Sequence, residues 1–184
     1  MNETDRPFTS RDLRTQLGLF PTGVAVITAV TDTGVKLGAT VGSFASVSLD
    51  PPLVSFNMAR SSNAFDAWAS VGTFAVNVLS QEQSDVSTRF ARALSDKWEG
   101  LEPAAGAVID APLLPEALAW FECITYAVHA AGDHAIILGE VQCFRRAAQM
   151  PMKPLVFFGG KYRRLESDLP IPTPFDETNW IHGW

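Results

Sequence analysis

Cysteine is nearly absent from this sequence: its 184 residues include two, Cys123 and Cys143. Two cysteines without Cys-x-x-Cys spacing are too few for a disulfide framework. They lie on either side of a hairpin signal at 132–134, so we expect them to lie roughly opposite each other on two strands. Buried reduced thiols and a cross-strand disulfide both remain open, and the first is favoured in a reducing compartment.

Positive charge and long apolar runs are also scarce. The chain has 14 Lys and Arg against 20 Asp and Glu, a net charge of −6 and a pI near 5.0. Without clustered Lys and Arg it lacks the footprint of a nucleic-acid-binding protein, although a local anion site remains open. No apolar run reaches the roughly 18 residues of a membrane span, and residues 1–12 do not resemble a signal peptide. We therefore expect a cytoplasmic protein with no membrane or nucleic-acid partner.

Several catalytic motifs are missing. No G-x-G-x-x-G follows a strand pattern, and neither the Walker loop nor the G-x-S-x-G nucleophile elbow occurs. His129 and His134 do not match metal-site spacing, even with the cysteines, and His129 lies in an apolar strand pattern typical of a hydrogen-bonded structural histidine. No metal site is predicted.

What is present is the composition of a globular protein, with 47% hydrophobic and 18% charged residues in a length that suits one domain. Strand patterns occur at Val24–Thr31, Val35–Ser48, Leu53–Ala59, Thr73–Ser80, Leu118–Ala131, Ala135–Arg146 and within Pro154–Leu165. Many strands with turns and few helices predict an antiparallel barrel rather than βαβ units.

Three short helices are predicted between these strands. The first covers Ser10 to about Gly18 behind the N-cap Thr9. Ser61 or Ser62 caps the second, and the third follows the capping-box pair Ser80 and Gln83, with a buried stripe of Val86, Phe90 and Leu94. Residues 95–115 show no period and are expected to form a surface loop.

The strand pattern at 35–48 is unusual because it is rich in hydroxyls. With alternate side chains on opposite faces, Thr40, Gly42, Phe44, Ser46 and Ser48 share one face that is polar but uncharged. Such a face suits a neutral heteroaromatic ring with several hydrogen-bond acceptors, which glycines would allow to approach closely. Solvent-facing hydroxyls are the alternative.

Five ordered segments resemble one known family, the short-chain flavin reductases that supply reduced flavin to two-component flavin-dependent monooxygenases. They are "FPTGVAVITA" (20–29), "GATVGSFASVSLDPPLVSF" (38–56), "FAVNVLSQEQ" (74–83), "GDHAIILGEV" (132–141) and "PLVFFGGKY" (154–162). Together they cover most of residues 17–165 in order.

The resemblance implies a mainly β fold with short helices, the FMN-binding split β-barrel, which is an antiparallel Greek-key barrel. It also implies a homodimer with flavin in a groove near the dimer interface. The barrel domain would span residues 1–169, and residues 170–184, rich in proline and tryptophan, would form a C-terminal arm. The arm has no counterpart in the family pattern, and we expect a dimer clasp ahead of a flavin cover or a docking arm.

The resemblance also implies site residues. Those expected at the isoalloxazine ring are Ala39, Thr40, Val41, Ser43, Ser46, Val47 and Ser48. Those expected at the flavin phosphate are Arg60, Ser61 and Ser62, at the start of a helix. Phe90 resembles a position near the flavin, although packing alone would explain it equally well. His134 is expected to position the nicotinamide, Asp133 to fix the turn or the imidazole, and Tyr162, with Lys161, to close the same side.

The implied activity is an NAD(P)H:flavin oxidoreductase. Hydride would pass from NADH or NADPH to FMN or FAD, and the reduced flavin would diffuse to a partner monooxygenase. A flavin-binding or electron-carrying module without nicotinamide oxidation is the alternative. An enzyme similar to pyridoxamine-phosphate oxidase is disfavoured because its substrate phosphate would require more basic residues.

Overall fold

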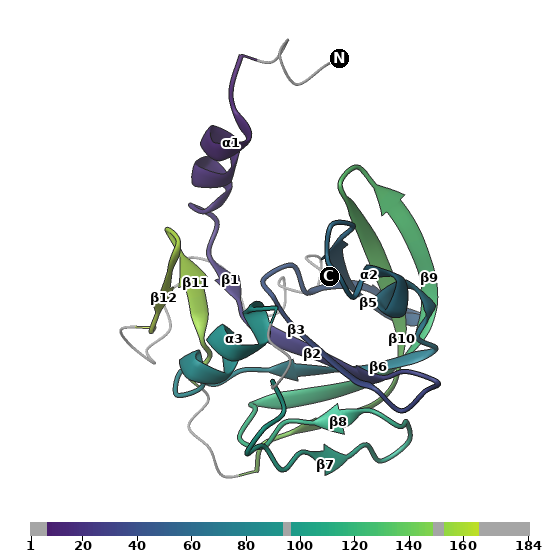
Figure 1. Ribbon diagram of the computed structural model, residues 1–184. Helices are drawn as coiled ribbons and strands as arrows, with labels where there is room; N and C mark the ends of the chain where they lie inside the picture. Colours follow the sequence, from purple (N-terminus) through teal and green to yellow (C-terminus); the bar gives the residue numbers. More distant parts are fainter. Residues whose placement is uncertain (1–6, 94–96, 149–152, 166–184) are drawn as a thin grey trace.

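The computed structural model describes residues 7–93, 97–148 and 153–165. Its centre is a seven-stranded antiparallel sheet of order β3-β2-β6-β9-β10-β5-β4 (Figure 1). These strands are β2 (Ala25–Val30), β3 (Lys36–Val41), β4 (Ala45–Leu49), β5 (Pro52–Ala59), β6 (Thr73–Val78), β9 (Ala119–Ala131) and β10 (His134–Arg146). The predicted mainly β, antiparallel fold is confirmed. The predicted arm at 170–184 lies outside the described residues.

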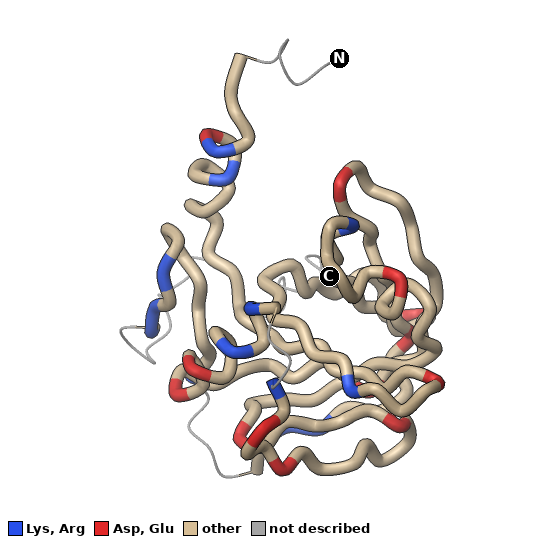
Figure 2. The backbone as a smooth tube through the Cα atoms, in the orientation of Figure 1, with Lys and Arg blue, Asp and Glu red and all other residues tan. Residues whose placement is uncertain are grey.

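Smaller elements surround this sheet. β1 (Thr22–Gly23), β11 (Val156–Phe158) and β12 (Lys161–Arg163) form one small sheet, and β7 (Ala104–Ala105) pairs with β8 (Pro112–Leu113). The helices are α1 (Ser10–Leu17), α2 (Phe65–Ser70) and α3 (Ser84–Ala91), and α1 stands away from the main sheet (Figure 1 and Figure 2). Among the described residues, no helix is long and apolar enough to cross a membrane.

The core covers both faces of the central strands β2 and β6, which are rich in β-branched and apolar residues and are buried at nearly every position. Phe56 packs edge-on against both Trp68 and Phe74, with ring centroids 5.9 and 5.1 Å apart. A side chain at Gly139 would collide with the Phe74 ring, so this glycine lets β10 pass close to β6. The aromatic cluster thereby anchors α2 and the strands that carry the site.

The run Val35–Ser48 was predicted as one strand, and this prediction is wrong. It forms β3 and β4, which lie at the two opposite edges of the seven-stranded sheet. Residues 42–44 link them, and a chain from Val41 to Ala45 can span at most about 14 Å. The sheet therefore curls until its two edges come close together. The alternation predicted over 40–48 does not apply, because the two halves belong to different strands.

The helix starts were predicted with mixed success. Thr9 caps α1 in a full capping box with Asp12 as predicted. α2 begins at Phe65, and its N-cap Ala64 has no side-chain bond. The predicted start of this helix at Ser61 or Ser62 is wrong, because the chain forms turns before Phe65. In these turns the Ser62 N–H donates to the Ala59 carbonyl, and the Phe65 N–H donates to the Ser62 carbonyl.

The pair Ser80 and Gln83 is in contact just before α3, but Gln83, not Ser80, is the N-cap residue of this helix. Gln83 Oε1 accepts the Ser80 N–H at 3.0 Å, whereas α3 begins at Ser84. Phe90 lies in the buried stripe of α3 as predicted, and Val86 is half-buried. Leu94, the last predicted member of the stripe, lies outside the described residues.

The segment expected to be a loop at 95–115 contains β7 and β8 and is fixed by a buried carboxylate. Glu122, 1% exposed, accepts the backbone N–H groups of Ala107, Val108 and Ile109 at 3.0, 2.8 and 3.2 Å. Burial raises the pKa of Glu122, but these three bonds and the Arg145 charge outweigh it and hold the pKa below its usual value. A sequence pattern cannot show such a long-range anchor.

The two cysteines lie on neighbouring, nearly opposite positions of β9 and β10. A register shift pairs Cys123 with Val141 and Cys143 with Glu122. Both thiols are free, Cys123 buried and Cys143 half-buried. Burial, followed by the Glu122 charge, raises the pKa of Cys123 to about 12. The structure therefore favours the free-thiol interpretation.

Candidate functional site

His134 is placed by a tight hairpin turn. A hairpin turn was predicted at 132–134. β9 ends at Ala131 and β10 begins at His134, so the turn consists of Gly132 and Asp133, and His134 is the first residue of β10. Gly132 has φ of 65°, which glycine adopts without a steric cost. The Asp133 carbonyl also accepts the Arg60 N–H at 2.9 Å. The turn is thus fixed to the end of β5.

The His134 ring is oriented by its neighbour. Its Nδ1 lies 2.8 Å from Asp133 Oδ1, and the His134 side chain is 44% exposed. The hydrogen bond from His134, and then its charge, hold the pKa of Asp133 below the usual value. A carboxylate on Nδ1 leaves Nε2 as the ring nitrogen that can face a ligand.

The outer edge of β3 faces this turn across the curled sheet. Trp98 Nε1 donates to the Lys36 carbonyl at 3.2 Å, and Lys97 Nζ to the Gly38 carbonyl at 3.1 Å. Backbone groups alternate sides along an antiparallel strand, so the N–H and C=O of Thr40 lie on the same free edge. An edge strand with unpaired backbone groups can hydrogen-bond a flat ligand.

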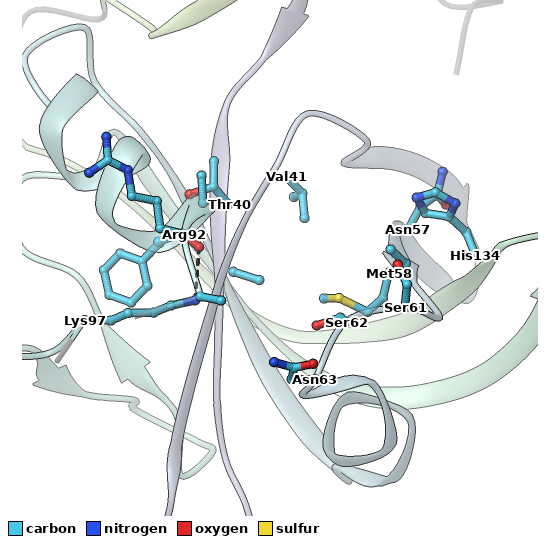
Figure 3. A pocket seen from close by; sticks show the side chains of 15 residues that line it. Thr40, Val41, Asn57, Met58, Ser61, Ser62, Asn63, Arg92, Lys97 and His134 are labelled. Atoms are coloured by element: carbon cyan, nitrogen blue, oxygen red, sulfur yellow. Dashed lines mark hydrogen bonds between the residues drawn. The ribbon is translucent and has the colours of Figure 1, made fainter. Parts of the chain in front are cut away.

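Two adjoining cavities lie where the sheet edges meet. The first has a volume of about 400 Å³ and extends toward Ser61, Ser62, Phe90 and Lys97 (Figure 3). The second has a volume of about 440 Å³ and extends toward Gly42, Ser43, Ala131 and Ile136. Both are lined by Thr40, Val41, Asn57 and His134. His134 therefore stands where the two cavities join.

The structure brings together many of the residues predicted for the site. The first cavity is lined by Ala39, Thr40, Val41, Ser61, Ser62, Phe90 and His134, and the second by Thr40, Val41, Ser43 and His134. Asp133 reaches the site through its bond to His134. These side chains come from separate elements, and the curled sheet and the hairpin bring them to one place.

Two of the predicted hydroxyls are engaged within the protein. Thr40 Oγ1 donates to the Ser87 carbonyl at 2.6 Å and so holds α3 against β3. Ser43 Oγ accepts the Asn57 N–H at 2.9 Å, in the place where β4 would otherwise continue its pairing with β5. Both side chains therefore help to build the walls of the site, with their hydroxyls already bonded to the protein backbone.

Five other predicted residues line neither cavity. Ser46, Val47 and Ser48 lie on β4 at the far sheet edge, with Val47 51% exposed. Arg60 lies with its guanidinium carbon 5.8 Å from the Phe65 ring centroid. Tyr162 lies on β12, where its hydroxyl is 2.8 Å from Ser87 Oγ. Tyr162 instead lines a separate cleft on the other side of α3, with Asp85 and Arg89.

Sequence reasoning missed other residues of the site. Asn57 and Met58, at the end of β5, line the first cavity, as do Asn63 and Lys97. No local pattern distinguishes these residues, because their place depends on how the sheet curls.

His129 lies on β9, and its side chain is exposed. Within residues 7–93, 97–148 and 153–165, no group of three or more His, Cys, Asp or Glu could hold a metal ion. Because the His129 side chain is exposed, the structure does not support the structural, hydrogen-bonded role predicted for it.

The fold and site can now be compared with known proteins. The solved structure of a nitrilotriacetate monooxygenase component B homolog from Mycobacterium thermoresistibile has a TM-score of 0.84 at 34% identity, covering 91% of this chain and 92% of that one. The NADH:FAD oxidoreductase SgcE6 of Streptomyces globisporus, solved with NAD and FAD fragments, has a TM-score of 0.80 at 34% identity, covering 92% and 98%.

Sequence relatives agree with these structures. The FMN reductase (NADH) SmoA of Agrobacterium fabrum is 46% identical over 159 residues, 84% of this chain and 86% of SmoA. The reductase component of the trigonelline monooxygenase of Acinetobacter baylyi is 44% identical over 80% of this chain, which spans only 47% of that relative. The model of the flavin reductase like domain matches residues 17–166. The chain therefore belongs to the flavin reductase-like family, as its sequence segments predicted.

Proposed function

We propose that the protein is an NAD(P)H-dependent flavin reductase that reduces FMN or FAD and releases the reduced flavin to a partner monooxygenase. The observation that carries this proposal is the junction at His134, where two cavities share four lining residues. A reaction between two nucleotides requires two adjoining sites with their reacting rings in contact. One cavity alone would serve a flavin carrier equally well.

The first cavity has the chemistry that a flavin requires. Its wall at Ala39–Val41 offers backbone groups of an edge strand, and Met58 and Phe90 add apolar surface for a flat ring. Ser61, Ser62 and Asn63 provide neutral polar groups toward one end. The lining thus fits an uncharged tricyclic ring with hydrogen-bonding edges and a polar tail.

The second cavity is assigned to the nicotinamide. It shares His134 and Thr40 with the first and extends along Gly42 and Ser43, where the two sheet edges meet. The ring of His134 is fixed by Asp133 and is well placed to hold a carboxamide next to the flavin ring. Lys161 and Tyr162, expected from the sequence to close this side, have no part in the proposal, since Tyr162 lines the cleft beyond α3.

The cofactors supply the chemistry: hydride passes from nicotinamide C4 to flavin N5. The chain contributes position and environment. The Thr40 bond to α3 and the Ser43 bond to β5 set the width of the gap between the sheet edges. Backbone N–H groups on the free edge of β3 can stabilise negative charge on a flavin ring. No acid–base pair is needed for this transfer.

Further parts of the proposal follow from the relatives and the surface. HsaB proteins of Mycobacterium tuberculosis and Rhodococcus jostii are named as reductase subunits of a flavin-dependent monooxygenase, which supports a monooxygenase partner. α1 has no buried residue, and Leu13, Leu17 and Phe20 in and after it are exposed, which supports a homodimer that would cover them. Closure of the curled sheet into a split barrel, and the cytoplasmic location, remain predictions.

A steady-state assay tests the proposed function. The purified protein is mixed with NADH or NADPH and with FMN, FAD or riboflavin, and nicotinamide oxidation is followed. We expect turnover that depends on added flavin, and the preferred pair identifies both substrates. Tight flavin binding without nicotinamide oxidation would contradict the proposal and favour the flavin-carrier alternative. Size measurement by sedimentation tests the homodimer separately.

A further inference from the structure

A third cavity lies beside the short strands β7 and β8, away from the proposed flavin and nicotinamide sites. It has a volume of about 350 Å³, and no described residue of its lining belongs to the first or the second cavity. β10 connects the two regions, because it begins at His134 and ends at Arg146, which lines the third cavity (Figure 1). A ligand in this cavity would therefore leave the places of flavin and nicotinamide open.

The floor of the third cavity is apolar and held by buried hydrogen bonds. Leu114 is 1% exposed, and Pro115 follows it. The Leu114 N–H donates to Asn77 Oδ1 at 2.7 Å, and Gln83 Nε2 donates to the Pro115 carbonyl at 2.8 Å. The Leu114 carbonyl accepts the indole N–H of Trp120 at 2.8 Å. The floor is thus formed before a ligand arrives, which lowers the entropic cost of binding.

Trp120 adds a flat aromatic wall to this floor. Its indole N–H is bonded to Leu114, which fixes the orientation of the half-buried ring. In the pairing of β9 with β10, Trp120 lies directly opposite Arg145. Side chains of directly opposed residues lie on the same face of a sheet. The third cavity therefore has an aromatic ring and a guanidinium group next to each other.

The charges at the third cavity favour an anion. The Arg145 side chain is 48% exposed, and its Nη2 lies 3.7 Å from Oε1 of the buried Glu122. This separation is longer than that of a charge-assisted hydrogen bond, so Glu122 orients the guanidinium without closing it to a ligand. Arg146 and Glu102 are exposed at the same cavity. The two positive charges outnumber the single negative one.

We propose that the third cavity binds a small aromatic carboxylate, with its ring against Trp120 and its carboxylate on Arg145. The planar guanidinium matches the two oxygens of a carboxylate, and the apolar floor removes the ring from water. A volume of about 350 Å³ is near the lower end for small-molecule sites, so it suits a ligand of one or two rings. This site is additional to the proposed function and does not depend on it.

The test uses benzoate as the probe. Benzamide is the neutral control with the same ring, and cyclohexanecarboxylate is the anion without an aromatic ring. Ligand-detected NMR titration of the purified protein measures their affinities, with and without saturating FMN and NAD⁺. We expect benzoate to bind about tenfold more tightly than benzamide, with cyclohexanecarboxylate weaker than benzoate. FMN and NAD⁺ should leave the affinity for benzoate unchanged.

Substitutions at the two arginines locate the site. Arg145→Met should lower the affinity for benzoate about tenfold and leave that for benzamide unchanged, and Arg145→Lys should keep part of the affinity. Arg146→Gln is the second variant, because it leaves the ion pair of Arg145 with Glu122 in place, and it should cause a smaller loss. Arg163→Gln, at an exposed arginine of β12 outside the lining of all three cavities, is the matched control. Thermal unfolding verifies that each variant is folded.

Several outcomes would overturn this inference. Equal affinities for benzoate and benzamide would show that the cavity does not recognise an anion. Displacement of benzoate by FMN or NAD⁺ would place it in the first or the second cavity instead. Wild-type affinity in both Arg145→Met and Arg146→Gln, or no benzoate binding at millimolar concentration, would also contradict it. None of these results bears on flavin reduction, which is measured separately.

Discussion

The Phe90 ring lies directly against the backbone of Gly38, in the space that a side chain at position 38 would occupy. This contact joins α3 to the edge of β3, and the Phe90 ring also packs edge-on against Trp98, with centroids 5.0 Å apart. Phe90 is buried in the core, which agrees with the packing role expected from the sequence, and it also lines the first cavity, where its contact with a ligand stays a prediction.

Substitution Gly38→Ala should force Phe90 out of its position. Overpacking of this kind costs about 1–3 kcal/mol of unfolding free energy, measurable by urea denaturation. We also expect weaker flavin binding, because the displaced ring lines the cavity. Gly72→Ala is the matched control, since a Cβ at Gly72 has nothing within 4 Å. Equal stability of the two variants would contradict the close contact described here.

The Thr40 hydroxyl is expected to act on structure rather than on the ligand. Thr40→Val keeps the shape of the side chain but removes the donor to the Ser87 carbonyl, a loss of about 1–3 kcal/mol in unfolding free energy. Thr88→Val, which removes a bond within α3 to the Ser84 carbonyl, should cost less. A Thr40→Val protein with full stability but no flavin binding would show direct contact of the hydroxyl with the ligand.

Glu122 should make the protein sensitive to acid. Its pKa is lower in the folded state, so its contribution to stability is fully present above the usual glutamate pKa and is lost as pH falls through the folded value. In Glu122→Gln, which has one acceptor oxygen for three N–H donors, we expect lower stability at neutral pH and a shallower decline below about pH 4.5. Thermal unfolding across this range, with the exposed Glu99→Gln as control, measures both effects. Parallel pH curves for wild type and Glu122→Gln would disprove the role of this carboxylate.

The two thiols should differ in reactivity. Cys123 is buried, with a pKa of about 12, so it stays protonated and shielded in the native protein at neutral and mildly alkaline pH. In a Cys143→Ser variant, a thiol reagent should modify Cys123 only after denaturant is added. The reverse variant, Cys123→Ser, should react faster because Cys143 is half-buried. Rapid native modification of Cys123 would show that this region of the core opens.

Local signals in the sequence predicted the parts of the fold that depend on neighbouring residues. The hairpin turn at 132–134 was predicted because its residue types favour a tight turn, and the Thr9 cap was predicted because threonine is a favoured N-cap residue. The segment 35–48 has strand propensity throughout. Its division at 42–44 depends on the sheet curling so that its two edges meet, which is a property of the whole fold.

The site was predicted in part for the same reason. The family segments include the residues near the turn and on β3, and these residues line the two cavities. Lys97 was missed because its position in the cavity depends on α3 packing against β3. Ser46, Val47 and Ser48 were expected at the ring from the family resemblance. The structure places them on β4, outside both cavities, and their role stays a prediction.

His134 tests the central claim most directly, because it stands where the two cavities join. The measurement is anaerobic stopped-flow reduction of flavin by NADH and NADPH, comparing wild type with His134→Ala and with Asp133→Asn. The account predicts rapid reduction by wild type, a loss of up to about a hundredfold in His134→Ala with flavin affinity preserved, and a smaller loss in Asp133→Asn. An unchanged reduction rate in His134→Ala would contradict the assignment of the nicotinamide to this junction.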